Sequence, residues 1–287
     1  MTLTAYLRQY YSFSTAKCYQ RSIENYLSNC KQADKAMYKD IVQYIGTLRK
    51  PHRKGSTVCL MASGIKVYYN YLCHAGIRAD NPAKSIMLKD RPGKDKQLQD
   101  LFNPGELDLL LNRKEHFTKQ AFRNKVLISL FIYQALRPVE AAALTTQDIN
   151  VEQGSIYIKA TPLTNARELP LKPNQVLLFY QYLHELRPKL LLGNPSDKLL
   201  LGFRGDALSA EGIISHILVS FKGMYPGRTV SAQKIRQSVI TNLLKQGHDI
   251  SMVQLFGGYK SADTVRLYST KQLDTLQEAI KKYHPIQ

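Results

Sequence analysis

The residues best suited to chemistry lie towards the end of the chain, between Ser231 and Thr270. Once the apolar positions of this stretch are assigned to helices, three polar residues stand out: Arg236, Tyr259 and Tyr268. A guanidinium presents a planar fork of donors that matches phosphate oxygens. A tyrosine hydroxyl can act as a nucleophile and form a covalent intermediate. Each residue alone is common in proteins, but together they suit attack on a phosphodiester.

The elements that must position these groups can be read from the apolar spacing. A helix is predicted from Ser231 to just before Gly247, which suits the left-handed residue past a helix end. A second, short helix is predicted over 251–256 and should stop at Gly257-Gly258. A third opens near Ser261 or Asp263 and includes Tyr268. The apolar positions of the first helix are Ile235, Val239, Ile240, Leu243 and Leu244.

The stretch resembles the C-terminal signature of the tyrosine recombinases, the integrase and Xer-type family. That signature is H-x-x-R, then a VQ..LGH segment, then the nucleophilic tyrosine. Residues 233–236 (QKIR), 253–259 (VQLFGGY) and Tyr268 stand at these places without gaps, so the resemblance implies a catalytic Arg236 and a nucleophilic Tyr268. Gln233 stands where histidine is usual and Tyr259 where histidine or tryptophan is usual. Both retain a hydrogen-bond donor, but Gln233 cannot carry a proton between groups.

A second candidate site is the stretch YQALRPVE, residues 133–140. An apolar helix leads up to it and Pro138 suits the start of the next, so Arg137 would lie beside a helix N-terminus, which favours an anion. Arg137 resembles the family's first catalytic arginine, with Glu140 in support. The alternative is a surface arginine paired with Glu140.

A β-hairpin is predicted where the pattern alternates, from 155–159 (SIYIK) to 167–171 (RELPL). The family carries its catalytic lysine on such a hairpin, which implies Lys159. The connection between the strands, ATPLTNA, is longer than the turn usual there. Lys172 and Arg167 therefore remain alternatives for this role.

The chain as a whole is predicted to be mainly α-helical with a small β-sheet, in the two-domain tyrosine-recombinase fold. The resemblance implies a helical, SAM-like core-binding domain over 1–83, a linker over 84–100 and an α+β catalytic domain over 101–287. Helices are expected from Ser14 or Thr15, after Asp40 and near Ser56. Further helices are expected from the N-cap Asn103, over 175–187 and from Ser209.

A basic loop precedes the helix expected at Ser56. It contains Arg49, Lys50, Arg53 and Lys54. Basic side chains at a helix N-terminus suit a DNA backbone phosphate. A solvated connector would have the same composition.

Composition indicates a polyanionic partner, because the formal charge is +18 and the pI is about 9.7. Nucleic acid is the first candidate and an anionic membrane surface the second. The sequence shows no signal peptide, bilayer-length apolar run or GxxxxGK[ST] loop. The four cysteines include no C-x-x-C pair, so we expect a reduced, cytoplasmic protein associated with the bacterial nucleoid, without metal or cofactor.

By this resemblance the protein is a site-specific DNA recombinase that acts through a 3′-phosphotyrosyl intermediate. Its partners would be double-stranded DNA with paired recombination sites and other subunits, its own or related ones, in a tetramer. A terminal amphipathic helix would close the core or dock on a neighbouring subunit; its apolar residues are Leu273, Leu276, Ala279 and Ile280. The alternatives are a non-catalytic DNA-binding protein of the same fold and a type IB topoisomerase.

Overall fold

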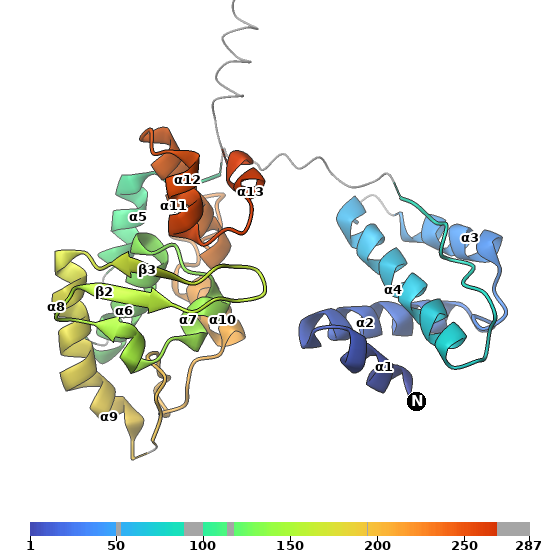
Figure 1. The fold of residues 1–287 in the computed structure, drawn as a ribbon, viewed down its shortest axis with the longest axis horizontal. Helices are drawn as coiled ribbons and strands as arrows, with labels where there is room; N and C mark the ends of the chain where they lie inside the picture. Colours follow the sequence, from blue (N-terminus) through green and yellow to red (C-terminus); the bar gives the residue numbers. More distant parts are fainter. Residues whose placement is uncertain (50–52, 89–99, 114–117, 194, 269–287) are drawn as a thin grey trace, which may run out of the picture. The chain divides into compact units, whose positions relative to one another are not determined.

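The computed structural model describes residues 1–49, 53–88, 100–113, 118–193 and 195–268. The chain separates into two compact units, Met1–Asp95 and Lys96–Gln287, which Figure 1 shows in blue to cyan and in green to red. Each unit has its own cluster of buried apolar residues. The expected terminal helix and Lys50 lie outside the described residues.

The described part of the first unit is helical, as predicted. Two tyrosines join its longest helices, because the hydroxyls of Tyr26 and Tyr69 are 2.7 Å apart and Tyr69 also donates to the carbonyl of Ala33 at 2.8 Å. A Cβ added at Gly64 would lie 2.8 Å from the Cβ of Ser22, so this glycine permits close approach of the two helices. The helices are α1 (Leu3–Tyr10), α2 (Phe13–Asn29), α3 (Tyr38–Leu48) and α4 (Gly55–His74).

The start of α2 differs from the prediction. The N-cap is Ser12, whose hydroxyl accepts from the amide of Thr15, so Ser14 and Thr15 lie within the first turn. An N-cap needs an extended backbone, and Ser12 has it with ψ of 153°. Composition alone does not distinguish three neighbouring hydroxyl residues.

The second unit combines helices with one small sheet. Its helices are α5 (Pro104–Leu111), α6 (Thr118–Tyr133), α7 (Pro138–Ala143), α8 (Pro173–Gln181), α9 (Arg187–Leu191), α10 (Ala210–Ser220), α11 (Ala232–Lys245), α12 (Ile250–Gly257) and α13 (Ala262–Arg266). A 3-10 turn, η1, covers Thr146–Asp148 and a π-helical segment, η2, covers Tyr182–Leu186. The strands are β1 (Ile149–Asn150), β2 (Ser155–Ile158) and β3 (Arg167–Pro170).

The three strands form an antiparallel sheet in the order β1-β2-β3. The predicted hairpin is confirmed, with Ile156 opposite Leu169 and Ile158 opposite Arg167. β1 was not predicted, because two residues are too short to show alternation. Figure 1 shows the β2–β3 loop extending from the sheet towards the side on which α7, α10 and α13 lie.

Helix α6 lies in the core of the second unit. It packs against α5, α8, α11 and η2, and Val126, Leu130 and Phe131 are fully buried. The Asn103 cap of α5 is confirmed: its side chain accepts from the amide of Glu106, whose carboxylate accepts from the amide of Asn103, both at 2.9 Å. The packing of α6 in this core fixes where the chain turns after Tyr133.

Two expected helices have different boundaries. The helix predicted over 175–187 is interrupted by η2, where the amide of Arg187 donates to the carbonyl of Tyr182 five residues earlier. Pro188 follows directly and lacks an amide hydrogen, which favours an irregular turn here. The helix predicted to include Tyr268 ends at Arg266, so Tyr268 lies in the turn that follows α13.

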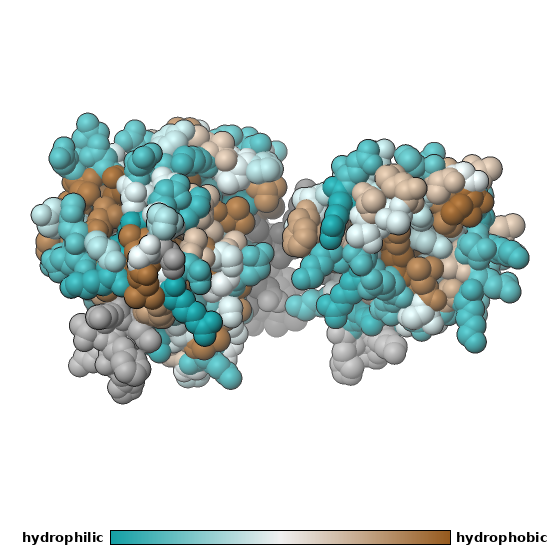
Figure 2. Space-filling view, turned by 90° about the horizontal axis from the view of Figure 1, so that it is seen from below, coloured by the Kyte–Doolittle hydropathy of each residue, from teal (hydrophilic) through white to brown (hydrophobic). Residues whose placement is uncertain are grey.

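Hydrophilic residues cover most of the face of each unit that Figure 2 shows, with smaller apolar patches between them. Among the described residues, no helix has the length and apolar character needed to cross a membrane. The prediction of a mainly helical chain with a small sheet is confirmed.

Candidate active site

Arg236 is a buried arginine held by two backbone carbonyls. Helix α11 has Ser231 as its N-cap and buries Ile235 and Ile240. The Arg236 side chain donates to the carbonyl of Gly257 at 2.6 Å and to that of Ala135. Burial lowers its pKa, which the neighbouring Tyr259 and Glu140 oppose. The group stays charged, because an arginine does not lose its proton in proteins.

The carbonyl of Ala135 lies in an unusual turn. Ala135 has φ of 49°, in the left-handed region, and it is fully buried between α6 and α7. This conformation costs an L-residue about 1–2 kcal/mol, so the surrounding packing must impose it. Alanine gives no sign of such a turn in the sequence.

Arg137 and Glu140 are related through the backbone. The amide of Arg137, at the N-cap of α7, donates to the Glu140 carboxylate at 2.8 Å. The Glu140 side chain is instead paired with Arg167 of β3 through two hydrogen bonds of 2.9 and 3.0 Å. The alternative, in which Arg137 is a surface arginine paired with Glu140, does not describe this arrangement, because the arginine paired with the Glu140 carboxylate is the buried Arg167. Burial raises the pKa of Glu140, but Arg167 outweighs it and holds the pKa below its usual value.

Tyr259 lies against both candidate catalytic arginines. Its ring centroid is 4.6 Å from the Cζ of Arg236 and 5.8 Å from that of Arg137, and the residue is 3% exposed. Burial raises the pKa of Tyr259; Arg236 opposes this rise and the phenol of Tyr268 adds to it. Tyr259 therefore remains protonated at neutral pH and can donate a hydrogen bond.

The glycine pair before Tyr259 allows this packing. A Cβ at Gly257 would meet the Tyr259 ring at 2.4 Å, and one at Gly258 would meet the guanidinium of Arg167 at the same distance. Gly258 also has φ of +65° and ends α12, as predicted. The β2–β3 loop joins here, because the amide of Asn165 donates to the carbonyl of Gly258 at 2.9 Å.

Tyr268 lies beside Tyr259. The two ring centroids are 6.4 Å apart, and Tyr268 is 6% exposed. Its amide donates to the carbonyl of Val265 at 2.9 Å, which ties it to the end of α13. The fold thus brings Tyr268 next to a residue that contacts Arg137 and Arg236.

The basic residues of the hairpin have different surroundings. Lys159 directly follows β2, is half-exposed, and lies 3.2 Å from the carboxylate of Asp148. Arg167 is buried against Glu140. Lys172 lies at the opposite end of β3 from the loop, because its neighbour Leu171 donates to the carbonyl of Gly154 at 2.7 Å.

Gln233 and the basic loop are not part of this buried cluster. Gln233 is exposed in the first turn of α11, about one turn before Arg236. In the first unit, Arg53 donates to the carbonyl of Leu48 at 3.5 Å, and Lys54 is the N-cap of α4, which begins near Ser56 as predicted. Arg49 follows the end of α3.

The site contains residues that the sequence did not single out. Arg167 was considered only as a substitute for the lysine, and the Asp148 and Ala135 contacts were not expected. Around Glu140, three guanidiniums (Arg137, Arg167 and Arg236) and one carboxylate leave two net positive charges. A cluster of this net charge suits a phosphodiester anion.

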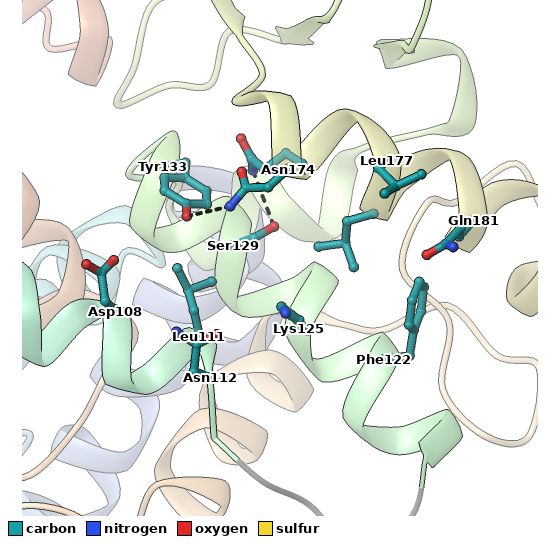
Figure 3. Close-up of a pocket in the computed structure, with 12 residues that line it drawn as sticks. Asp108, Leu111, Asn112, Phe122, Lys125, Ser129, Tyr133, Asn174, Leu177 and Gln181 are labelled. Carbon is teal, nitrogen blue, oxygen red and sulfur yellow. Dashed lines mark hydrogen bonds between the residues drawn. The ribbon is translucent and has the colours of Figure 1, made fainter.

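A cavity that is separate from these residues lies elsewhere in the second unit. It has a volume of about 370 Å³ and opens between α5, α6 and α8, as Figure 3 shows. Asn174 donates to the Tyr133 hydroxyl at 3.2 Å and Gln175 to Ser129 at 3.3 Å along its wall. None of the predicted site residues lines it.

Comparison with known proteins identifies the family of the chain. The Phage integrase family model matches residues 101–274. The chain is 26% identical to the tyrosine recombinase XerD of Oceanobacillus iheyensis over 283 residues, covering 96% of this chain and 93% of that protein. It is 25% identical to the tyrosine recombinase XerC of Staphylococcus epidermidis over 248 residues, covering 86% of this chain and 82% of the other.

Two solved structures show the same fold. The XerA recombinase matches with a TM-score of 0.53 and 20% identity over 99% of both chains. The XerH site-specific recombinase bound to a palindromic difH substrate matches with a TM-score of 0.69 and 21% identity, over 92% of this chain and 77% of that one. The match to more than half of the chain, together with these full-length likenesses, establishes that this protein belongs to the phage integrase family and is a tyrosine site-specific recombinase, an enzyme that cleaves and rejoins DNA.

Proposed function

We propose that Arg137, Arg236, Tyr259, Tyr268 and Lys159 form the catalytic centre of this recombinase. The observation that carries the proposal is the position of Tyr259, whose ring lies beside Arg137, Arg236 and Tyr268. Tyr259 and these three neighbours come from four separate segments of the chain. A scissile phosphate placed at this point would meet two cations, a phenol donor and a candidate nucleophile.

The arginines stabilise the charge that develops during attack on the phosphodiester. Negative charge gathers on the nonbridging oxygens, and Arg137 and Arg236 neutralise it. Arg236 is already held by the carbonyls of Gly257 and Ala135, so it needs little reorganisation. Tyr259, with its raised pKa, donates its phenol hydrogen to a phosphate oxygen.

In the chemical step, the phenol oxygen of Tyr268 attacks phosphorus and releases its proton to solvent. The bond between phosphorus and the 5′ oxygen breaks, and the ammonium group of Lys159 gives a proton to that oxygen. The product is a 3′-phosphotyrosyl enzyme and a free 5′ hydroxyl. Attack by a 5′ hydroxyl reverses these events and rejoins the strand without ATP, because the phosphotyrosyl bond retains the bond energy.

The assembly that we propose is a clamp on duplex DNA. Residues 1–83 and 101–287 would bind opposite sides of the DNA, joined by a linker over 84–100, and Arg49, Lys50, Arg53 and Lys54 would contact its phosphates. The net charge supports this, as does the DNA named with XerH and with a lambda integrase dimer bound to a COC′ core site. Four subunits, its own or related ones, would pair two sites in the bacterial cytoplasm.

A nicked suicide substrate tests the proposal, because loss of a short fragment traps the covalent intermediate. The wild type is expected to form a protein–DNA adduct that survives denaturant. Tyr268→Phe should bind the same DNA equally well and form no adduct. The control is Tyr157→Phe, on the exposed side of β2, which should form the adduct normally. An adduct in Tyr268→Phe would assign the nucleophile to another residue.

A further inference from the structure

The ion pair between Lys159 and Asp148 is not explained by the chemistry proposed above. The Nζ of Lys159 lies 3.2 Å from both carboxylate oxygens of Asp148. A proton donor for the leaving oxygen must face the DNA, but in this structure the ammonium group of Lys159 faces the carboxylate of Asp148 in the same chain. The two side chains also differ in exposure: 55% for Lys159 and 7% for Asp148.

Asp148 is the fixed partner of this pair. Its carboxylate accepts from the amide of Thr145 at 2.8 Å and from the Thr145 hydroxyl at 2.7 Å, which close the turn η1. Burial raises the pKa of Asp148, but the hydrogen bonds from Thr145 and Lys159 outweigh it and the pKa lies below its usual value. The carboxylate is thus charged and held in place at neutral pH.

Lys159 is the movable partner and lies close to the arginine cluster. A cavity of about 30 Å³ is lined by Asp148, Lys159 and Glu140, and Glu140 holds Arg167 and the amide of Arg137. A lysine carries its charge on a flexible four-carbon stem, so it can exchange one partner for another without backbone movement. An ion pair that is half in solvent is weak enough to be exchanged.

We propose that Asp148 is a positioning residue that holds Lys159 in a parked position in the DNA-free protein. When DNA is bound, Lys159 leaves Asp148 and turns to the leaving 5′ oxygen. This inference rests on the proposed role of Lys159 as proton donor. During cleavage the P–O5′ bond breaks, a proton passes from Nζ to O5′, and the neutral amine regains a proton from solvent.

Asp148→Asn tests the parked position in the full-length protein. Asparagine keeps an oxygen for the Thr145 donors and removes the charge that holds Lys159. In single-turnover cleavage at saturating protein, the variant should cleave an ordinary suicide substrate roughly two- to fivefold faster than wild type, the range expected for one weak ion pair. Asp80→Asn is the charge-matched control: it removes an exposed partner of Arg78 in the first unit and should not change the rate.

Two proposals must be distinguished: that Lys159 is the proton donor, and that Asp148 holds Lys159 in a parked position. A substrate with sulfur in place of the bridging 5′ oxygen distinguishes them, because a thiolate leaves without a proton donor. Lys159→Ala should be slow on the oxygen substrate and regain speed on the sulfur substrate. Asp148→Asn should then match wild type on sulfur, and should add nothing in the Lys159→Ala background. If Lys159→Ala stays slow on sulfur, Lys159 is not the proton donor and both ideas fail. If it is rescued but Asp148→Asn gives no acceleration, or accelerates equally without Lys159, the parked position alone is wrong.

Lysine acetylation of the wild-type protein tests the parked position without relying on Asp148→Asn to fold. In DNA-free protein, acetylation of Lys159 should be at least about twofold slower than that of the exposed Lys222 at low salt, and the two should converge at about 1 M salt, where the pair is screened. Equal labelling of the two lysines at low salt would overturn the inference.

Discussion

At the residue scale, the candidate site differs from the family signature at two positions: Gln233 stands where histidine is usual, and Tyr259 where histidine or tryptophan is usual. Tyr259 is buried between the arginines and Tyr268, where a phenol donor can replace another ring donor. Gln233 is exposed and can donate through its amide but cannot carry a proton. We therefore expect the loss of a proton carrier at Gln233 to affect the rate of cleavage rather than DNA affinity.

The variants Gln233→His and Gln233→Ala test this expectation. General acid–base catalysis contributes ~10²–10⁴-fold, so histidine should accelerate cleavage and introduce a pH dependence near roughly pH 6–7. Alanine should slow cleavage only modestly, because one neutral hydrogen bond is worth about 1 kcal/mol. Single-turnover cleavage from about pH 5 to 9 measures both. A histidine variant as slow as the alanine variant would show that another group already carries the proton.

At the element scale, one buried ion pair connects α7 to β3. Glu140 closes the first turn of α7 through the amide of Arg137 and pairs with Arg167, whose guanidinium also lies against Gly258. The hairpin loop joins the end of α12 at the same place, through Asn165 and Gly258. The start of α7, the hairpin and the end of α12 are thus held together, and they border Arg137, Lys159 and Tyr259 respectively.

Glu140→Gln tests how much this pair stabilises the second unit. Glutamine can still accept from the Arg137 amide, but it leaves the Arg167 charge buried without a counterion, so we expect a loss of about 3–5 kcal/mol in the free energy of unfolding. The matched control is Glu106→Gln. Glu106 also closes a helix N-terminus and pairs with an arginine, Arg228, but it is partly exposed, so the loss should be about 1 kcal/mol or less.

The same pair predicts a pH dependence. The folded-state pKa of Glu140 is lowered, so its charge contributes fully above the ordinary value of 4.5 and the contribution is lost as the pH falls through the lower folded value. The difference in unfolding free energy between wild type and Glu140→Gln should therefore shrink as the pH falls below about 4.5. Denaturant unfolding at several pH values measures it. A difference that does not change with pH would contradict the assignment.

At the scale of the whole molecule, charge and division into two units are the relevant properties. Each unit has its own core, and the chain carries a formal charge of +18. A basic protein that binds DNA phosphates releases counterions when it binds. The proposed clamp would therefore make DNA binding depend on salt and on the presence of the first unit.

We expect the DNA affinity of the full chain to fall steeply with salt, as a linear decrease of log K with log salt concentration. Deleting residues 1–83 should remove most of the binding, because half of the proposed clamp is lost. Filter binding or anisotropy at several salt concentrations measures both. A nearly flat salt dependence would argue against a clamp, and equal affinity of fragment 101–287 would contradict the proposed division.

The sequence by itself determined the features that depend on neighbouring residues. The Asn103 cap and the end of α12 at Gly258 follow from hydrogen bonds or backbone preferences within a few residues, and both were predicted. The pairing of β2 with β3, whose partners lie within 15 positions of one another, was predicted from the alternating pattern of each strand. The spacing of Arg236, Tyr259 and Tyr268 was sufficient to suggest the family. Where several similar residues compete locally, as with the caps of α2, the prediction missed the position.

Only the tertiary structure decided which side chains meet. Glu140 is paired with Arg167 rather than Arg137 because β3 and α7 pack together, and this contact spans 27 positions of the chain. The backbone of Ala135 is left-handed, which is unfavourable for an L-residue, so the surrounding packing must impose this turn. The contact between Lys159 and Asp148 depends on how η1 approaches the end of β2. Such contacts are set by the shared core, because long-range packing joins residues whose local sequence carries no sign of one another.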